Sequence, residues 1–267
     1  MSARDYPHRR YNPLTGEWLL VSPQRTQRPW LGQTEPAAPD TVPAYDPDCY
    51  LCPGNLRSGG ARNPVYTSTF VFDNDFPALL PPSADLVEAE VGEGFFQVQP
   101  ESGRCQVTCF SPRHDLSISQ LPREQVIQVV HTWTSQTQQL GSLEDISYVQ
   151  VFENRGAMMG ASNPHPHSQV WASAHIPNEI RKEMDHQAAY HASRQACLLC
   201  AYLQEERTQG ERLVAVNEGF TALVPFWAIW PFEILVLANR HLASLTDLDK
   251  AEQASLADIL QQVSAKY

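Results

Sequence analysis

The sequence predicts an α+β protein with a largely antiparallel sheet, flanking helices and an internal repeat whose second copy is incomplete. Three observations support this fold class. Short runs rich in β-branched and aromatic residues are separated by turn residues, as in antiparallel strands. One long segment, residues 122–141, carries apolar residues at helical spacing. The order of motifs in the first half of the chain recurs in the second half.

Each element has its own local signal. A Pro-Leu-Thr-Gly turn precedes the first strand, Pro122 opens the first helix with Gly141 at its end, and Pro177 begins a charged helix that extends to about Ser193. The segment from Arg28 to Asp48 is rich in proline and polar residues and is expected to form an exposed arm. The expected strands are Trp18–Ser22, Thr69–Phe72, Gln106–Phe110, Ser147–Phe152 and His167–Ala174.

The internal repeat rests on a constant offset. His241 follows His114 by 127 residues, Glu252 follows Glu124 by 128, and each half has one C-x-x-C pair. At this offset Tyr267 falls opposite Leu140, so the second copy is expected to lack its final strands. We therefore expect two units, residues 1–177 and the partial copy 178–267, although chance similarity of two strand-loop-helix units is an alternative.

Length and charge exclude several classes of protein. A chain of 267 residues with 42% hydrophobic content can bury a sizeable core, so a peptide, a fibre and a disordered tail are excluded. A net charge of −11 argues against nucleic acid and anionic membranes as partners. The N-terminal segment lacks the apolar core of a signal peptide, and we expect a soluble, cytoplasmic protein.

Six cysteines in a cytoplasmic chain are typical of metal ligands, catalytic thiols or core residues rather than disulfides. Cys105 and Cys109 alternate with Val107 in a strand-like run and are expected to be core thiols. The remaining four form the pairs Cys49/Cys52 and Cys197/Cys200, whose spacing suits a metal.

The segment Asn163–Trp171, NPHPHSQVW, carries the strongest chemical signal. If it is extended, His165, His167 and Gln169 share one face, while the two prolines require it to enter the sheet at an end or along an edge. Together, Cys49, Cys52, His114 and His165 have the S₂N₂ composition of a closed structural zinc site. The alternative is that the cysteines are reduced core thiols.

His167 is the predicted nucleophile. A neutral imidazole can attack phosphorus near pH 7 when its other ring N–H is held by a carbonyl group. Gln169 can donate an amide N–H to a phosphate oxygen, an interaction worth about 3 kcal/mol in a catalytic site. The loop from Gly156 to Ser162 can add backbone N–H groups and a hydroxyl group, although two glycines alone are weak support.

These residues resemble the galactose-1-phosphate uridylyltransferases, a branch of the histidine-triad superfamily. The likeness extends from about His8 to Tyr267 and includes HRRYNPLTGEWLLVSPQRTQRPW, NPVYTSTFVFDNDFPAL, VQVFENRGAMMGASN and VPFWAIWPFE besides NPHPHSQVW. The resemblance implies a histidine-triad-like sheet and uridylyl exchange between UDP-glucose and galactose 1-phosphate, in the Leloir pathway of galactose metabolism, by double displacement through a covalent uridylyl-histidine. It implies a homodimer with sites between subunits.

Further roles are implied by matching the family's motifs. Asn74 and Asp75 would hold the ribose, and Arg25 and Arg28 would reach the substrate of the neighbouring subunit, unless they are solvated arm residues. Glu183 would be a ligand of a second metal, iron or zinc. The residues implied for the nucleotide phosphates are Asn154, Gly160, Ala161 and Ser162, with Gln169.

Departures from the family leave alternatives open. The family continues past Tyr267 into a second histidine-bearing strand, so the chain is expected to be truncated or naturally short, with an incomplete second metal site. Cys197, Cys200 and His241 are a further candidate metal site. One alternative function is a related nucleotidyl transferase or phosphorylase that acts on an ADP-sugar or a dinucleotide. The other is a non-catalytic module stabilised by zinc.

Overall fold

The computed structural model describes residues 5–29, 42–83 and 94–267, so residues 30–41 of the predicted arm lie outside the described residues. The chain divides into two compact units that are not consecutive in sequence. One comprises residues 42–177 and 242–267, and the other comprises residues 1–41 and 178–241. We call the first the sheet unit and the second the hairpin unit. The division into 1–177 and 178–267 stays a prediction about the repeat in the sequence.

The sheet unit is built on a four-stranded antiparallel sheet with the order β3-β4-β6-β5. The strands are β3 (Phe70–Asp73), β4 (Gly103–Cys109), β5 (Tyr148–Phe152) and β6 (His167–Ser173). The sequence predicted all four within a few residues of these bounds. β6 is a central strand, and Pro164 and Pro166 lie just before it, so neither proline interrupts a ladder.

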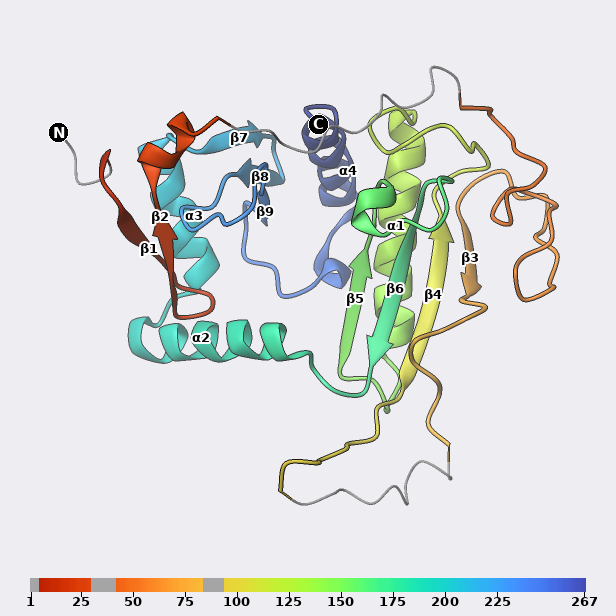
Figure 1. Ribbon diagram of the computed structural model, residues 1–267, viewed down its shortest axis with the longest axis horizontal. Helices are drawn as coiled ribbons and strands as arrows, with labels where there is room; N and C mark the ends of the chain where they lie inside the picture. Colours follow the sequence, from red (N-terminus) through yellow and green to blue (C-terminus); the bar gives the residue numbers. More distant parts are fainter. Residues whose placement is uncertain (1–4, 30–41, 84–93) are drawn as a thin grey trace. The chain divides into compact units, whose positions relative to one another are not determined.

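One face of this sheet is covered by α1 (Arg123–Gly141), as Figure 1 shows. Val126, Val129 and Val130 of α1 are fully buried. Two hydrogen bonds attach the helix to the sheet: Trp133 Nε1 donates to Ser168 Oγ at 2.8 Å, and Thr108 Oγ1 donates to Gln136 Oε1 at 2.7 Å. The opposite face of β4 and β6 therefore remains available for the functional site.

The chain returns to the sheet unit at its end. After the short helix η5 (Leu245–Asp247), α4 (Lys250–Ser264) packs against α1, and Gln261 Nε2 donates to the Leu121 carbonyl at 2.8 Å. Asp249 and Glu252 form a capping box, which explains why α4 begins where it does. The helix that the predicted repeat matches with α1 thus packs on α1 itself.

The hairpin unit begins with β1 (His8–Asn12) and β2 (Glu17–Val21), which pair antiparallel, followed by the short helix η2 (Pro23–Gln27). Gly16 has a φ of +73° in the predicted turn, and its N–H donates to the Asn12 carbonyl at 2.9 Å. The helices are α2 (Asn178–Arg194) and α3 (Leu198–Gln209), of which the sequence analysis predicted only α2. A three-stranded antiparallel sheet completes the unit, with strands β7 (Leu213–Val216), β8 (Phe220–Leu223) and β9 (Leu235–Ala238).

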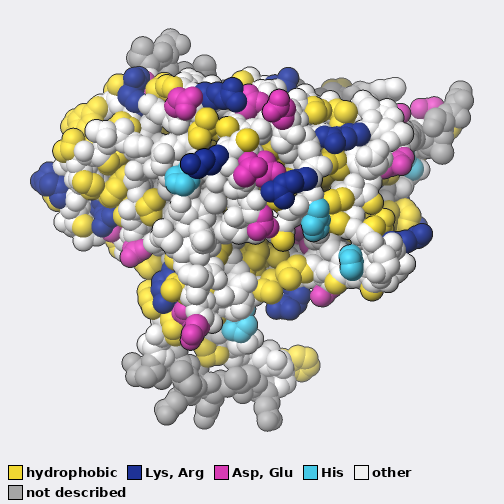
Figure 2. Space-filling model, turned by 180° about the vertical axis from the view of Figure 1, so that it is seen from behind, with side chains coloured by type: hydrophobic (Ala, Val, Ile, Leu, Met, Phe, Trp, Pro, Cys, Tyr) yellow, Lys and Arg dark blue, Asp and Glu magenta, His cyan; other side chains and the backbone are white. Residues whose placement is uncertain are grey.

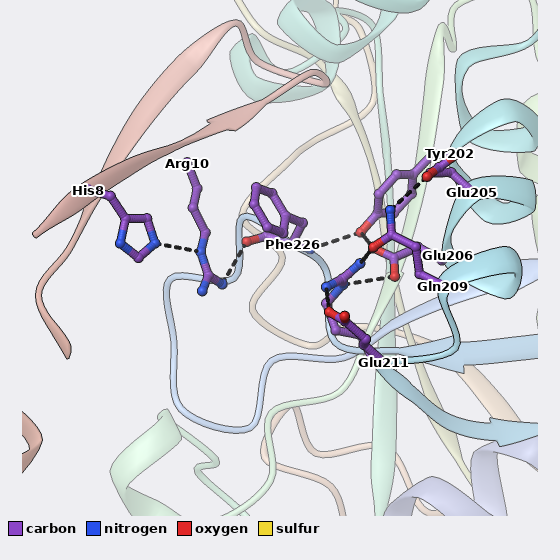
Figure 3. A network of polar contacts seen from close by, with 9 residues as sticks. His8, Arg10, Tyr202, Glu205, Glu206, Gln209, Glu211 and Phe226 are labelled. Carbon is purple, nitrogen blue, oxygen red and sulfur yellow. Dashed lines mark hydrogen bonds and ion pairs between the residues drawn. The ribbon is translucent and has the colours of Figure 1, made fainter. Parts of the chain in front are cut away.

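A buried ion pair organises the hairpin unit (Figure 3). Glu206 on α3 is 1% exposed. Arg212 Nε donates to both of its carboxylate oxygens, at 2.9 Å to Oε1 and 2.8 Å to Oε2. The Tyr202 hydroxyl group donates to Glu206 and accepts from the Phe226 amide, while Arg10 donates to the Phe226 carbonyl at 3.0 Å. These contacts join the hairpin to α3, although no sequence signal predicted them.

Candidate functional site: a cysteine-histidine cluster beside a histidine-lined cavity

The sheet unit brings together all four predicted metal ligands, Cys49, Cys52, His114 and His165. Their ligand atoms lie within 4.8 Å of one another and all four residues are buried. Cys52 Sγ lies 3.6 Å from His114 Nδ1 and 3.5 Å from His165 Nδ1. A tetrahedral zinc ion with Zn–S of about 2.3 Å and Zn–N of about 2.0 Å separates sulfur and nitrogen ligands by about 3.5 Å, so the donor set fits such an ion.

The protonation state of His165 also suits a metal ligand. Burial lowers the pKa of His165 to about 4, so the ring is neutral at pH 7. Its Nε2–H donates to the Ser111 carbonyl at 3.0 Å, which places the lone pair on Nδ1, beside Cys52. Burial raises the pKa of the Cys52 thiol to about 11, and a bound cation would offset this by stabilising the thiolate.

Two asparagine side chains support the C-x-x-C loop. Asn55 Nδ2 donates to the Cys49 carbonyl at 2.8 Å, and Asn63 Nδ2 donates to the Cys52 carbonyl at 3.0 Å. Asn163 Oδ1 accepts from the His165 N–H at 2.8 Å, and so it orients the segment that supplies the fourth ligand. The sequence analysis gave none of these asparagines a role, although Asn163 opens the NPHPHSQVW motif.

His165 and His167 do not share one exposed face, contrary to the period-two expectation. The strand begins only at His167, and His165 is turned into the buried cluster. The alternation holds from residue 167 onward, where His167 pairs with Cys109 and Gln169 pairs with Val107. Pro166 therefore lies between a member of the buried metal-capable cluster and the first residue of β6, and the two histidines are not equivalent.

His167 is held in the tautomer that a nucleophile requires. Its Nδ1–H donates to the His165 carbonyl at 2.7 Å, which leaves the lone pair on Nε2. Burial lowers the pKa of His167, which favours the neutral ring. Nε2 has no hydrogen-bond partner among the described residues. The expected arrangement of one ring nitrogen on a carbonyl group and the other available is thus present.

A cavity of about 260 Å³ lies against this end of β6 and approaches the volume of small-molecule sites. It brings together five of the predicted site residues, Asn74, Asp75, Ser162, His167 and Gln169. The rest of its lining consists of Tyr50, Leu51, Ser58, Phe72, Phe76 and Val107. The aromatic members were not predicted individually, but Phe72 and Phe76 flank Asn74 and Asp75 in the segment FDNDFPAL.

Two of the polar lining residues are already oriented by neighbours. Asp75 accepts from the Gly59 N–H at 3.2 Å and lies 3.4 Å from Arg57 Nε. Asn74 Oδ1 accepts from the Phe76 N–H at 2.9 Å, so its NH₂ group remains for a ligand. A carboxylate and an amide at one end of a cavity can hydrogen-bond the vicinal hydroxyl groups of a ribose.

Other predicted residues are not among those lining this cavity. Asn154, Gly160 and Ala161 precede Ser162 in the same loop. Of these four residues, Ser162 lines the cavity. Arg25 lies in η2 and Arg28 directly after it, in the hairpin unit, and both are exposed. Glu183 lies half-buried on α2, where burial raises the pKa of its carboxyl group, and it belongs to no metal-capable group within the described residues.

The hairpin unit contains a second metal-capable group, Cys197, Cys200 and His241, whose ligand atoms also lie within 4.8 Å of one another. Cys200 Sγ lies 3.6 Å from His241 Nδ1. Cys197 is the N-cap residue of α3, and His241 follows β9. This group is more exposed than the first and has three members within the described ranges.

The predicted core thiols and the surface complete the description. Cys105 and Cys109 are buried and free, as expected. On the face drawn in Figure 2, Lys and Arg side chains lie among Asp and Glu side chains in the described part of the chain. None of the described helices combines the length and apolar character that a membrane span requires.

Comparison with known proteins identifies the family of this chain. The family model for the N-terminal domain of galactose-1-phosphate uridyl transferase matches residues 1–177, and that for its C-terminal domain matches residues 183–267. The galactose-1-phosphate uridylyltransferase of Rattus norvegicus is 44% identical over 265 residues, which cover 99% of this chain and 69% of the relative. That of Saccharomyces cerevisiae is 42% identical over 272 residues, 98% of this chain and 74% of the relative.

Solved structures show the same relationship. A uridylyltransferase aligns with a TM-score of 0.70 and 27% identity, over 95% of this chain and 72% of that chain. An ADP-glucose phosphorylase from Arabidopsis thaliana, with bound ADP-glucose, aligns with a TM-score of 0.73 and 25% identity, over 96% of this chain and 76% of that chain. The histidine-centred cleft, the two family models and the curated relatives together show that this chain belongs to the galactose-1-phosphate uridylyltransferase family.

Proposed function

We propose that the protein transfers a uridylyl group between UDP-glucose and galactose 1-phosphate by double displacement, with His167 as the nucleophile. The observation that carries this proposal is the hydrogen bond from His167 Nδ1–H to the His165 carbonyl, 2.7 Å long, which leaves Nε2 at the cavity. A neutral imidazole held in this way needs no base to activate it.

In the first step, Nε2 attacks the α-phosphorus of UDP-glucose. An N–P bond forms, the P–O bond to glucose 1-phosphate breaks, and the uridylyl group stays on His167. The proton on Nδ1 remains hydrogen-bonded to the His165 carbonyl, which stabilises the positive charge that the ring acquires. The leaving group is a phosphate oxygen, which departs without being protonated. The reaction therefore needs no general acid at position 169, and a neutral amide that hydrogen-bonds the phosphate is sufficient there.

In the second step, a phosphate oxygen of galactose 1-phosphate attacks the same phosphorus and the N–P bond breaks. UDP-galactose leaves and the neutral ring of His167 is restored. Asn74 and Asp75 are proposed to hold the ribose, and Ser162 and Gln169 the nucleotide phosphate, because all four line the cavity with His167. Asn154, Gly160 and Ala161 are proposed to join the phosphate site from the same loop.

We propose a homodimer in which Arg25 and Arg28 reach the partner's substrate, as the family resemblance implies. Both side chains are exposed and cationic, so each can bind a phosphate group. This arrangement would give an acidic protein the local positive charge that a diphosphate needs.

Zinc is the proposed metal of Cys49, Cys52, His114 and His165, because two cysteines and two histidines in one buried cluster are the donor set that zinc prefers. When bound, it would supply a structural crosslink. The His165 carbonyl that orients His167 belongs to a proposed ligand, so the zinc site and the nucleophile are coupled through one residue. For a second metal, we propose Cys197, Cys200 and His241 rather than Glu183, whose side chain joins no metal-capable group within the described chain.

An ADP-sugar phosphorylase is the second candidate, favoured by the structural similarity to the Arabidopsis thaliana protein. The ribose pair does not distinguish uracil from adenine. The relatives of about 40% identity are named as uridylyltransferases, which favours a uridine nucleotide. A non-catalytic zinc module is disfavoured because such a module has no use for an oriented, available imidazole nitrogen.

The test is covalent labelling. The protein is incubated with UDP-glucose labelled in its uridylyl group and, separately, with ADP-glucose labelled in its adenylyl group. The expected result is an acid-labile, base-stable adduct with UDP-glucose alone and no labelling of His167→Gly. His175→Ala removes an exposed histidine that contacts Glu101 and is the matched control, which should label normally. Labelling of His167→Gly would remove this residue from the mechanism, and preferential adenylylation would favour the phosphorylase.

A further inference from the structure

The strand that carries His167 and Gln169 also carries Trp171, and the three side chains follow the alternation of β6. Trp171 Nε1–H donates to Gln169 Oε1 at 3.0 Å. We propose that Trp171 is a positioning residue that fixes which end of the Gln169 amide faces the nucleotide phosphate. This inference rests on the proposed uridylyl transfer and assigns a residue that the reasoning from sequence left without a role.

The chemistry of the indole selects one orientation of the amide. An indole N–H can only donate a hydrogen bond, whereas the two ends of a glutamine amide are an acceptor and a donor. Trp171 must therefore face Oε1, and the NH₂ group is directed away from it. If the amide were flipped, two donors would face each other and the hydrogen bond would be lost.

The orientation matters because a phosphate oxygen only accepts hydrogen bonds. The NH₂ group of Gln169 has no partner among the described residues, and Gln169 lines the cavity beside His167. In the flipped orientation the amide carbonyl would face the anionic oxygen and repel it. A neutral amide has no charge of its own to set its direction, so its orientation depends on a neighbour such as Trp171.

The indole is itself firmly placed. Trp171 lies opposite Cys105 of β4 and Gln150 of β5, in the middle of the sheet. Its ring meets Phe152 edge-on, with centroids 5.5 Å apart and planes at 80°, and Phe152 pairs with Gln169 in the register. A half-buried ring that projects from a central strand and contacts a neighbouring aromatic ring can hold the amide with little loss of its own freedom.

The molecule contains a matched control. Trp133 on α1 also donates its indole N–H to a side chain of β6, Ser168, at 2.8 Å, but on the opposite face of the sheet. Trp171→Phe and Trp133→Phe therefore make the same chemical change on the two faces of one strand. Only the first is expected to affect transfer.

The experiment measures single-turnover formation of the His167 adduct and steady-state exchange in the two variants. We expect Trp171→Phe to lower the adduct rate and kcat roughly tenfold, part of the roughly hundredfold attributed to one well-placed donor, with little change in KM. Trp133→Phe should react at the wild-type rate. Equal rates for wild type and Trp171→Phe, or equal losses in the two tryptophan variants, would overturn the proposal.

A double-mutant cycle with Gln169→Glu separates positioning from general damage. A glutamate accepts the indole hydrogen bond but presents no donor to the phosphate, so Gln169→Glu should lose more rate than Trp171→Phe. Adding Trp171→Phe to Gln169→Glu should cost nothing further, because there is no amide left to orient. Additive losses would show that Trp171 acts elsewhere.

A direct measurement remains informative even if Trp171→Phe folds poorly. In protein with ¹⁵N-labelled tryptophan, Gln169→Leu should shift the indole N–H resonance of Trp171 and leave that of Trp133 in place. An unchanged Trp171 resonance would contradict the hydrogen bond. The two proposals fail on different results. The proposed function fails if His167→Gly is still labelled, whereas the positioning role fails if Trp171→Phe reacts as fast as wild type or loses no more rate than Trp133→Phe.

Discussion

The two cysteine-histidine clusters are alike in three ligands and differ in the fourth. In each, a C-x-x-C pair is joined by a histidine whose Nδ1 lies 3.6 Å from the second cysteine's sulfur, as measured from Cys52 to His114 and from Cys200 to His241. The cluster of the sheet unit adds His165 and is buried, whereas that of the hairpin unit has three members in the described chain and is partly exposed.

The fourth proposed ligand, His165, connects the buried cluster to the proposed nucleophile. His165 contributes its side chain to the cluster and its carbonyl to His167, so one residue links the proposed zinc to the proposed nucleophile. His241 has no such neighbour on a following strand within the described residues. A C-x-x-C pair with one histidine thus forms a metal-capable group in each unit, while the proposed reactive site also depends on the segment before β6, which supplies His165.

The largest effect is expected from Cys52→Ser, which removes a buried thiolate from the four-ligand cluster. We expect loss of the tightly held zinc, a loss of several kcal/mol in the free energy of unfolding, and loss of the uridylyl adduct, because the His165 carbonyl is no longer held in place. Zinc content is measured in the purified protein, the free energy of unfolding by urea denaturation, and the adduct by labelling with UDP-glucose. Cys105→Ala removes a buried thiol outside both clusters and should retain the zinc. Full zinc occupancy in Cys52→Ser would contradict the assignment.

The hairpin unit is expected to depend on its ion pair. Glu206→Gln leaves Arg212 without its buried carboxylate, and we expect a cost of about 3 kcal/mol or more in the free energy of unfolding. Urea denaturation, followed by a probe in this unit, measures it. Glu205→Gln changes the adjacent exposed carboxylate, which contacts only Gln209, and should cost less than about 0.5 kcal/mol. Similar costs in both variants would mean that Glu206 adds little to stability.

Metal exchange should distinguish the two clusters directly. A colorimetric chelator is expected to remove zinc from untagged protein in two phases, fast from the exposed three-ligand cluster and slow from the buried four-ligand cluster. His241→Ala should abolish the fast phase alone. His191→Ala, which removes another exposed histidine of the hairpin unit, should leave both phases. A single phase in the wild type would show that the clusters do not differ as proposed.

The smallest effect is expected from Tyr66→Phe. The Tyr66 hydroxyl group donates to the Leu51 carbonyl at 2.7 Å and lies 3.3 Å from His165 Nε2, so its removal loosens the support of the fourth ligand. We expect a cost of about 1 kcal/mol and a roughly tenfold faster slow phase of zinc release. Tyr148→Phe, which removes an exposed hydroxyl group, is the control. An unchanged slow phase would show that Tyr66 does not support the cluster.

Much of the site followed from local sequence. The thiols and imidazoles of the buried cluster were identifiable from residue type and spacing, and the carbonyl-held tautomer of His167 was expected before the fold was known. Trp171 was not foreseen, because its role depends on which amide atom it meets. Asn55 and Asn63 were missed because they act through backbone carbonyl groups, which have no signature in a sequence.

The hairpin unit shows the limit more sharply. Nothing in the sequence indicates that Arg10 and Phe226 meet, because residues 216 positions apart share no local pattern. The same holds for the packing of α4 on α1, which the predicted repeat matched in sequence but did not place side by side. Such contacts arise when the apolar face of a helix or sheet packs against another element. The sequence of one face does not show which of several possible elements covers it.

The sequence by itself determined the strands and the first helix of the sheet unit, the chemistry of the proposed buried ligands and the residue proposed to attack phosphorus, because these depend on side-chain type and short-range spacing. Only the tertiary structure decided that His165 turns inward while His167 faces the cavity, and that an indole holds the amide of Gln169. Those outcomes depend on where β6 begins and on which atoms of two neighbouring side chains meet on one face of it. Packing against the rest of the sheet unit fixes both, and residue type and spacing do not show that packing.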